Sequence, residues 1–356
     1  MSGARRFPKT LTLVLALLLP LLFALSLRVG ASGQLDLGSA LRGCLATLGW
    51  GEPLAGVQQT ILELRLWRTL TTAGVGAALA LSGALVQGLF RNGLAAPSVL
   101  GVTGGASLGA TVAILILGGA GPALVGVADT GLATVIVPLF GFVGAVLAVA
   151  LIATLAAPGG RMSVPTLLLT GIAVNTCIAG LLSLISSLML SDWEVSRAIL
   201  SWTFGTLDDR TAYHALTVWS GLALAAAAVP FVSWELDLLQ GGEDDAASLG
   251  VDIRRVRVLC IGAAALSAAA AVAVAGQIAF VGLVVPHLVR LLAGRGHRAL
   301  LPLSMVGGMV FLLTLELANH WLLGGSALQP GVVMSLIGGP FFVVLLLLNR
   351  REIDSW

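Results

Sequence analysis

Ten apolar segments, most of them close to twenty residues long, occupy most of this chain and are separated by short polar breaks. A helix needs about twenty mostly apolar residues to cross the hydrocarbon core of a bilayer, whereas the strands of a membrane barrel are alternating segments of about ten residues. The fold class is therefore predicted as an all-α polytopic membrane protein with about ten transmembrane helices. The expected spans are residues 9–29, 64–89, 97–118, 131–156, 164–190, 213–234, 255–275, 279–293, 299–322 and 330–348.

The composition excludes an ordinary aqueous surface. Hydrophobic residues make up 58% of the chain and charged residues only 10%, while a soluble domain carries about 25% charge. The apolar run at 11–27 is longer than the 7–15 residues typical of a signal-peptide core. We therefore interpret it as part of the first span.

The distribution of basic residues predicts the orientation. With the N-terminus inside and ten spans, 13 of the 19 basic residues fall on the cytoplasmic side. Arginine and lysine are enriched in cytoplasmic loops, so we expect both termini in the cytoplasm.

Lys9 is the only lysine, and it stands in no glycine-rich turn. A nucleotide-binding P-loop needs a lysine in such a turn, so any ATP that drives this protein must be hydrolysed by another chain. Cys44, Cys177 and Cys260 are far apart and fit no metal-ligand spacing. We expect no cofactor, no metal site, no catalytic residue and no nucleic-acid partner.

Two Gly- and Ala-rich stretches carry a family resemblance. Leu64 to Ala110 joins a charged entry to a long apolar helix, a polar break and a second apolar segment, and Ala275 to Arg298 reads AGQIAFVGLVVPHLVRLLAGRGHR. Small residues let membrane helices approach closely. Both stretches resemble signatures of the FecCD-type permeases, the membrane subunits of importers for iron-siderophores, haem and vitamin B12. The likeness extends to Leu167–Asn175 and Pro330–Leu347.

The resemblance implies a type II ABC importer permease with inverted repeats, and residues 1–356 as a single transmembrane domain in the cytoplasmic (inner) membrane of a bacterial cell. It implies a homodimer of two permease copies around a central pathway, with two ATPase subunits below and a periplasmic or lipid-anchored binding protein above. The fifth and tenth spans would face the pathway. The cargo it implies is a metal chelate, an iron-siderophore first, with haem and cobalamin as alternatives.

Residues 235–254 form the expected cytoplasmic coupling segment, which holds the densest acid cluster of the chain. Acids favour the N-terminus of a helix and Gly250 favours its end, so Gly242 to Gly250 reads as a short helix. By resemblance this helix would seat in a groove of the ATPase; a solvated loop is the alternative. The coupling residues implied are Glu243, Asp244, Asp245, Ala246, Leu249 and Gly250.

A cytoplasmic gate is implied at the break after the second span. By resemblance Asn92 and Leu94 would line it, opposite Val164 and Pro165 at the start of the fifth span. Family members usually have proline where Gly93 stands, and glycine loosens the turn. A plain interhelical turn is the alternative.

A docking corner for the binding protein is implied on the outer face. Arg65 and Arg68 are three residues apart and share one side of the second span; by resemblance they bind acidic residues of the binding protein. Snorkelling to lipid phosphates is the alternative. His320 stands where the family usually has a further docking arginine. Trp67 and the tripeptide Ala327-Leu328-Gln329 also depart from the family pattern.

Two polar residues could indicate other functions. His287 follows Pro286 near the cytoplasmic side, but no second ligand lies at metal-binding spacing, so we interpret it as a structural polar cap. Glu316 is the one acid well inside an apolar span, and an intramembrane carboxylate is by default a functional candidate. An ion-coupled secondary transporter, the alternative function, would need several such residues. A membrane enzyme would need a catalytic cluster that the sequence lacks.

Overall fold

The structure is a computed structural model, and it describes residues 7–29, 36–47, 49–50, 56–117, 132–157, 163–323 and 328–348. Both ends of the chain lie outside the described residues, and they carry part of the basic residues that predict the orientation. Ala327, which was named with the docking corner, lies outside them as well.

The described residues are helical and contain no strand. A helix occupies each of the ten predicted segments, and three further helices lie between them. The elements in chain order are α1 (Phe7–Arg28), α2 (Leu37–Thr47), α3 (Val57–Leu89), the 3₁₀ turn η1 (Pro97–Leu100), α4 (Val102–Ile116), α6 (Leu132–Leu155), α7 (Val164–Leu188), α8 (Trp193–Phe204), α9 (Ala212–Ala226), α10 (Val229–Leu239), α11 (Glu243–Ser248), α12 (Ile253–Ala275), α13 (Val281–Ala293), α14 (His297–Leu323) and α15 (Pro330–Leu348).

Six of the described helices are long and apolar enough to cross a membrane, and α9 with α10 makes a seventh if the pair counts as one span. Helices α4, α13 and α15 are apolar but shorter. The all-α polytopic fold class is confirmed. The span predicted at 213–234 is bent: the axis turns by 53° between α9 and α10, next to Pro230, which cannot donate a helical hydrogen bond.

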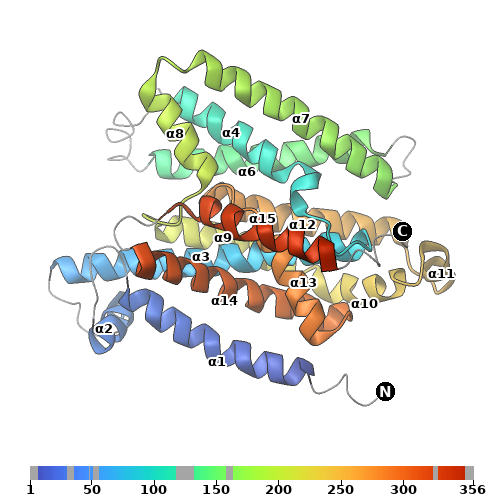
Figure 1. Ribbon diagram of the computed structural model, residues 1–356, viewed down its shortest axis with the longest axis horizontal. Helices are drawn as coiled ribbons and strands as arrows, with labels where there is room; N and C mark the ends of the chain where they lie inside the picture. Colours follow the sequence, from blue (N-terminus) through green and yellow to red (C-terminus); the bar gives the residue numbers. More distant parts are fainter. Residues whose placement is uncertain are drawn as a thin grey trace.

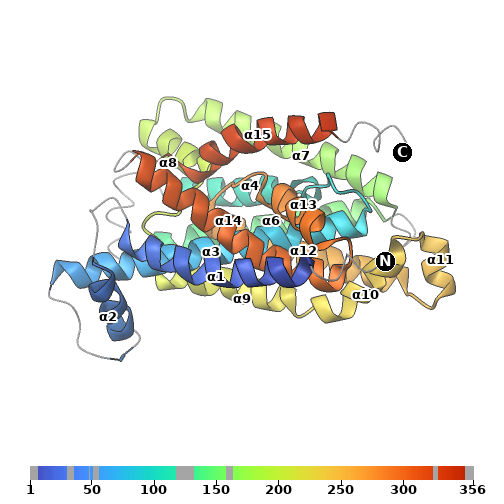
Figure 2. The ribbon, with the colours of Figure 1, turned by 60° about the horizontal axis from the view of Figure 1, so that its bottom comes forward.

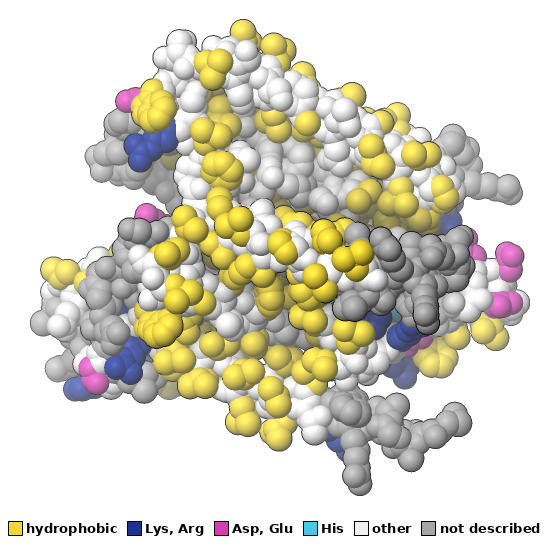
Figure 3. Space-filling view, viewed as in Figure 1, with side chains coloured by type: hydrophobic (Ala, Val, Ile, Leu, Met, Phe, Trp, Pro, Cys, Tyr) yellow, Lys and Arg dark blue, Asp and Glu magenta, His cyan; other side chains and the backbone are white. Residues whose placement is uncertain are grey.

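The long helices run between two ends of the molecule (Figure 1). Helices α2 and α8 lie at one end, called here the α2 end. Helix α11, the start of α1 and the end of α15 lie at the other, called the α11 end (Figures 1 and 2). In the space-filling view, charged side chains gather toward these two ends and the band between them is largely apolar (Figure 3). This is the surface that a bilayer requires of a spanning protein.

Helix α3 is the centre of the bundle, with 94% of its most apolar window buried. Its glycines allow the close approach expected from the sequence: a methyl group on Gly76 would meet the backbone of Gly308 in α14, and one on Gly83 would meet the backbone of Gly282 in α13. Ser82 donates to the Ala264 carbonyl of α12 at 2.7 Å. The small residues of the first signature therefore serve helix packing.

Pro286 interrupts the hydrogen-bond ladder of α13, and α3 compensates for it. A proline has no N–H, so the carbonyl four residues earlier, Gly282, loses its helical donor. The fully buried Gln87 amide lies 3.4 Å from that carbonyl and 3.2 Å from the next one, Leu283. The proline is tolerated because a neighbouring helix supplies the missing donor.

Helix α2 lies between the first two predicted spans, 9–29 and 64–89, where no helix was predicted. Its start is set by Asp36, whose carboxylate accepts the Gly38 N–H at 3.0 Å. Ala40 is fully buried against Leu27, Leu62 and Leu66. Helix α3 also begins at Val57, seven residues before the predicted start. The added turns bring Leu62 into this apolar cluster.

Candidate functional site

Two polar clusters lie at opposite ends of the bundle. At the α2 end, Arg65 and Arg68 of α3 reach the last turn of α1. Arg65 donates to the carbonyls of Leu27 at 3.2 Å and Arg28 at 2.7 Å. The last carbonyls of a helix have no partner within the helix and carry its negative dipole end. The guanidinium therefore caps α1.

Arg68 extends the same cap and joins it to α14. Its guanidinium donates to the carbonyls of Ser26 at 3.0 Å and Val29 at 2.9 Å. On its other side, its Nε lies 2.9 Å from a carboxylate oxygen of Glu316, and both side chains are less than 10% exposed. Glu316, the carboxylate singled out in the sequence, is thus half of a buried ion pair.

His320 completes this cluster one turn further along α14. Its Nε2 lies 3.2 Å from the Arg68 guanidinium, 3.5 Å from the Asp208 carboxylate and 3.8 Å from that of Glu316. The cluster therefore joins α1, α3, α14 and the connection between α8 and α9. We call Arg65, Arg68, Glu316, His320 and Asp208 the α2-end cluster.

Two ionisable groups of the connection before α9 have shifted pKa values. The hydrogen bond from His320 holds the pKa of the Asp208 carboxyl below its ordinary value, and the charges of Arg68 and Arg210 add to this. Burial lowers the pKa of the Arg210 guanidinium to about 10, although Asp209 and Asp208 favour its charge. Both groups stay charged at neutral pH.

Arg65, Arg68 and His320, the residues implied for docking, are buried within this chain. Their exposed fractions are 4%, 7% and 7%, because the C-terminal carbonyls of α1 and the carboxylate of Glu316 draw the guanidinium groups inward. The sequence pattern placed both arginines on one helix side but said nothing about α1. Their part in docking a binding protein stays a prediction.

The short helix predicted in the coupling segment is present as α11. It begins after Gly242 with all three acids in its first turn and ends before Leu249. Ala246 is fully buried and anchors the helix to the core, whereas Leu249 is 68% exposed. Asp244, Asp245 and Gly250 are exposed as well. The exposed part of this segment therefore combines one leucine with two acids.

Two details of the coupling segment differ from the expectation. Glu243 forms an ion pair with Arg257 of α12 at 2.5 Å, so it ties α11 to the bundle as well as contributing to the acidic surface. Residues 235–239 belong to α10. The segment between the spans is therefore shorter than 235–254.

The predicted gate turn is ordered by its own side chain. The Asn92 carboxamide oxygen accepts the Leu94 N–H at 2.9 Å, a local turn typical of asparagine. Asn92 is exposed and Leu94 half-buried. Gly93 lies against α13: a methyl group there would be 2.9 Å from the Arg290 guanidinium. The glycine that replaces the usual proline thus leaves room for Arg290.

The start of α7 holds the other predicted gate residues, Val164 half-buried and Pro165 exposed. The contacts between α7 and the gate region lie further along the helix: Asn175 donates to the Ser98 carbonyl at 3.1 Å, and a methyl group on Gly171 would meet the Val99 carbonyl. The structure joins α7 to η1, and the pairing of Val164 and Pro165 with Asn92 and Leu94 stays a prediction.

A second polar cluster at the α11 end escaped the sequence analysis. Asp237 of α10 and Gln240, the residue directly after that helix, contact His297 at the start of α14. These residues are 57 and 60 positions apart in sequence, so no local pattern reveals them. Their only sequence signal is a polar residue at the end of an apolar segment.

Helices α7 and α15 leave much of their apolar surface exposed. Only 11% of the α7 window is buried, and Leu169, Leu184 and Leu188 are each more than half exposed. In α15, Leu336 is 66% and Ile337 51% exposed. Thr176, Ser183 and Ser187 are also exposed on α7, so its surface mixes apolar and small polar groups.

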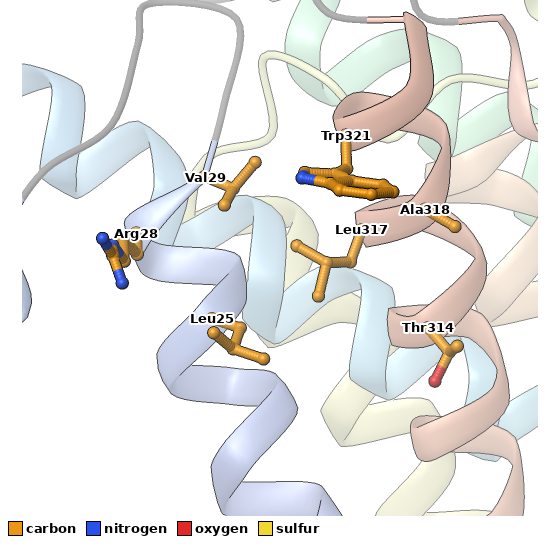
Figure 4. A pocket seen from close by; sticks show the side chains of 7 residues that line it. All are labelled: Leu25, Arg28, Val29, Thr314, Leu317, Ala318 and Trp321. Atoms are coloured by element: carbon orange, nitrogen blue, oxygen red, sulfur yellow. The ribbon is translucent and has the colours of Figure 1, made fainter.

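An apolar hollow of about 440 Å³ lies at the α2 end between α1 and α14. Leu317 and Trp321 of α14 face Leu25 of α1 and Val29, the residue after that helix, across it, while the Arg28 guanidinium points away (Figure 4). Trp321 is 73% exposed. An indole at the end of a span is typical of the membrane interface.

Within the described residues, no three His, Cys, Asp or Glu side chains lie together where they could hold a metal ion. His287 is half-buried in α13 beside the gate turn; its Nδ1 would lie 3.9 Å from a methyl group on Gly93. This position is compatible with the polar cap predicted for it.

The comparisons with known proteins agree with this geometry. Residues 17–348 match the FecCD transport family. The chain is 37% identical to a cobalamin import system permease protein, BtuC, of Halobacterium salinarum over 87% of this chain and 80% of that one. It is 35% identical to a hemin transport system permease protein, HmuU, of Yersinia pestis over 82% and 84%.

A solved structure described as an inward-facing conformation of a putative metal-chelate type ABC transporter matches with a TM-score of 0.75. The identity is 32%, and the match covers 95% of this chain and 99% of that one.

Proposed function

The chain belongs to the FecCD transport family, and from that premise we propose how this permease subunit of an ABC importer works. It is a multi-pass membrane protein and a transport component, not an enzyme; the family assignment favours it over an ion-coupled secondary transporter. We propose one permease domain in the bacterial cytoplasmic membrane, with the α11 end in the cytoplasm and the α2 end outside.

An ATPase and a substrate-binding protein are the partners that such a permease requires. The observation that carries the coupling proposal is the form of α11: Ala246 and the ion pair of Glu243 fix the helix to the bundle, while Leu249, Asp244 and Asp245 remain exposed. A fixed helix with an exposed apolar tip can transmit a partner's movement. Two ATPase subunits would each seat one such helix.

We propose that two copies of this chain line the pathway with α7 and α15. Their exposed faces support this, because a face that no part of the chain covers is free for a second copy, the cargo or lipid. The serine and threonine side chains on α7 offer hydrogen bonds to a polar cargo without a fixed charge. The turn at Asn92 and Leu94, with Val164 and Pro165, would close the cytoplasmic side.

The α2 end is the proposed docking surface of a periplasmic or lipid-anchored binding protein. Arg65, Arg68 and His320 would support this surface from inside the protein and would not contact the binding protein themselves. They hold the end of α1 and the connection at Asp208, while the exposed Arg28 and Arg42 can meet acidic side chains directly. Charge-assisted contacts of arginine with carboxylates are the strongest available to such a surface.

The proposed cargo is a metal chelate, with an iron-siderophore as first candidate and haem and cobalamin as alternatives. The relatives described above are named for cobalamin and hemin, and the exposed face of α7 suits any of these amphipathic molecules. The partner binding protein, purified with its ligand, identifies the cargo by its absorption spectrum: a Soret band for haem, corrin bands for cobalamin, a charge-transfer band for a ferric siderophore.

Reconstitution tests the function as a whole. The permease, its ATPase and its binding protein are placed in proteoliposomes, and uptake of the identified chelate is followed with and without ATP. We expect uptake only when all three proteins and ATP are present. ATP hydrolysis by the permease alone, or uptake driven by an ion gradient without the ATPase, would overturn the proposal.

A further inference from the structure

His297, the first residue of α14, is held on one edge by α10. Its backbone N–H and its ring Nδ1 each lie 2.7 Å from the same carboxylate oxygen of Asp237. The Gln240 carboxamide lies 3.2 Å from the ring Nδ1 and also donates to the Arg295 carbonyl at 3.2 Å. The His297 side chain is 3% exposed, so these contacts fix the ring in the interior.

The opposite edge of the ring rests on α3. A methyl group on Gly88 would be 2.6 Å from the ring Nε2 and 3.0 Å from its Cδ2, so the imidazole fills the space that a side chain at 88 would take. Nε2 is buried and has no hydrogen-bond partner among the described residues. The ring cannot retreat from Gly88 without losing Asp237, because its other edge is bound there.

The ring of His297 lies between two helices that lead to predicted functional segments. Helix α10 ends two residues after Asp237 and continues through Gly241 and Gly242 into α11. Ala246 of α11 and Leu236 of α10 are both fully buried in one apolar cluster. Helix α3 ends one residue after Gly88 and leads into the gate turn. His297 therefore lies between the ATPase-facing helix and the gate.

We propose that His297 is a positioning residue that couples α11 to the gate turn: a shift of α10 and α11 moves the ring through Asp237, and the ring moves the end of α3 through Gly88. This inference rests on the proposed function, because it needs an ATPase seated on α11. It assigns a role in coupling to Asp237, His297 and Gly88, which lie outside the coupling and gate residues implied by the family resemblance.

The test measures molecules of chelate imported per ATP hydrolysed in the reconstituted complex. Gly88→Ala inserts a methyl group against the ring, and His297→Ala removes the ring. We expect each to lower this ratio at least tenfold while ATP hydrolysis continues. The ratio of the double variant should be no lower than that of the more strongly impaired single variant, because both changes break the same contact.

The controls separate coupling from folding. Gly262→Ala, also in a buried bundle helix but with open space around its added methyl group, should leave the ratio unchanged. His297→Asn keeps a donor for Asp237, but its side chain does not reach Gly88. Its import per ATP should therefore be as low as that of His297→Ala, although its melting temperature stays near that of the parent. This variant carries the test if Gly88→Ala does not assemble.

The outcomes are distinct. Single variants with an unchanged ratio, a double variant whose loss is the product of the single losses, or a fully coupled His297→Asn would each overturn the inference. A parent complex that does not import chelate with ATP overturns the proposed function instead.

Discussion

At the α2 end, Arg65, Arg68 and Glu316 are each less than 10% exposed, whereas at the α11 end Leu249 is 68% exposed beside exposed acids. In a soluble protein the opposite would be usual, with charge outside and leucine inside. The difference shows that the exposure of a side chain at each end depends on whether the neighbouring helices offer polar groups that still lack a hydrogen-bond partner. The carbonyls of α1 need donors, while α11 has already buried Ala246 and leaves its tip for a partner.

The comparison also separates two uses of charge. The arginines of the α2-end cluster hold helices together, and their removal should be felt as lost stability. The groups at the tip of α11 contribute little to the fold, and their removal should be felt as lost coupling. The predictions below test this separation, from the largest expected effect to the smallest.

Replacing Leu249 with Asp should abolish transport without lowering the melting temperature. A charge buried in the ATPase groove without a partner costs several kcal/mol, while in the free permease Leu249 is exposed and the change is neutral. The measurements are uptake in proteoliposomes and co-purification of the ATPase. Deletion of residues 243–250 should give the same loss of uptake. Normal co-purification of the ATPase with the Leu249→Asp variant would contradict the coupling role.

Replacing Arg68 with Gln should destabilise the permease by about 3–5 kcal/mol, because Glu316 is left as an unpaired buried charge. The measurement is the free energy of unfolding in detergent. The matched control is Arg28→Gln at the same end: Arg28 is exposed, and exposed substitutions change stability by less than about 0.5 kcal/mol. Equal stability of the two variants would mean that the α2-end cluster is not a structural cap.

Reversing the exposed Arg28 and Arg42 to Glu should weaken binding of the substrate-binding protein by about 0.2–1 kcal/mol for each residue. Salt screens exposed charges, so the difference from the parent should shrink at high ionic strength. The measurement is binding-protein affinity for the permease in nanodiscs at two salt concentrations. If the affinity does not change in this variant, but Arg65 or Arg68 variants that still fold lose binding, the binding protein contacts Arg65 and Arg68 directly and not Arg28 and Arg42.

Asp208→Asn should have the smallest effect and one that depends on pH. The hydrogen bond from His320 holds the pKa of Asp208 below its ordinary value of 3.8. A depressed pKa in the folded state adds stability at neutral pH, and this is lost as pH falls below that ordinary value. The Asp208 side chain is 57% exposed, so solvent screening keeps the gain small.

The melting temperatures of the parent and the Asp208→Asn variant should therefore differ slightly at pH 6, and the difference should shrink as the pH falls below 3.8. A difference that grows as the pH falls would have the wrong sign and would exclude the contact with His320 as its cause.

The spans and the coupling helix were predictable because each depends on a local pattern. Length and apolarity place a helix in each of the ten segments, and Gly242, the three acids and Gly250 place the boundaries of α11 within two residues. Helix α2 was missed because its apolar side is only a few residues wide. The bend between α9 and α10 was missed because Pro230 can also stand inside a continuous span.

The functional residues divide in the same way. Leu249 and Asn92 are exposed as their local sequence suggests, the first at a helix end and the second in a turn. The burial of Arg65 and Arg68 could not be predicted because it depends on α1, some forty residues earlier. His297 was missed because its partners come from α10 and α3, which no spacing within α14 can reveal.

The sequence by itself determined the class of this protein: ten apolar segments can satisfy their backbone groups in a bilayer only as helices, and two Gly-rich signatures identify the family. The tertiary structure decided the role of each charge. Whether Arg68 meets water, a partner or Glu316 depends on which unsatisfied carbonyls and carboxylates the packed helices bring to it, and that arrangement exists only after α1, α3 and α14 have come together.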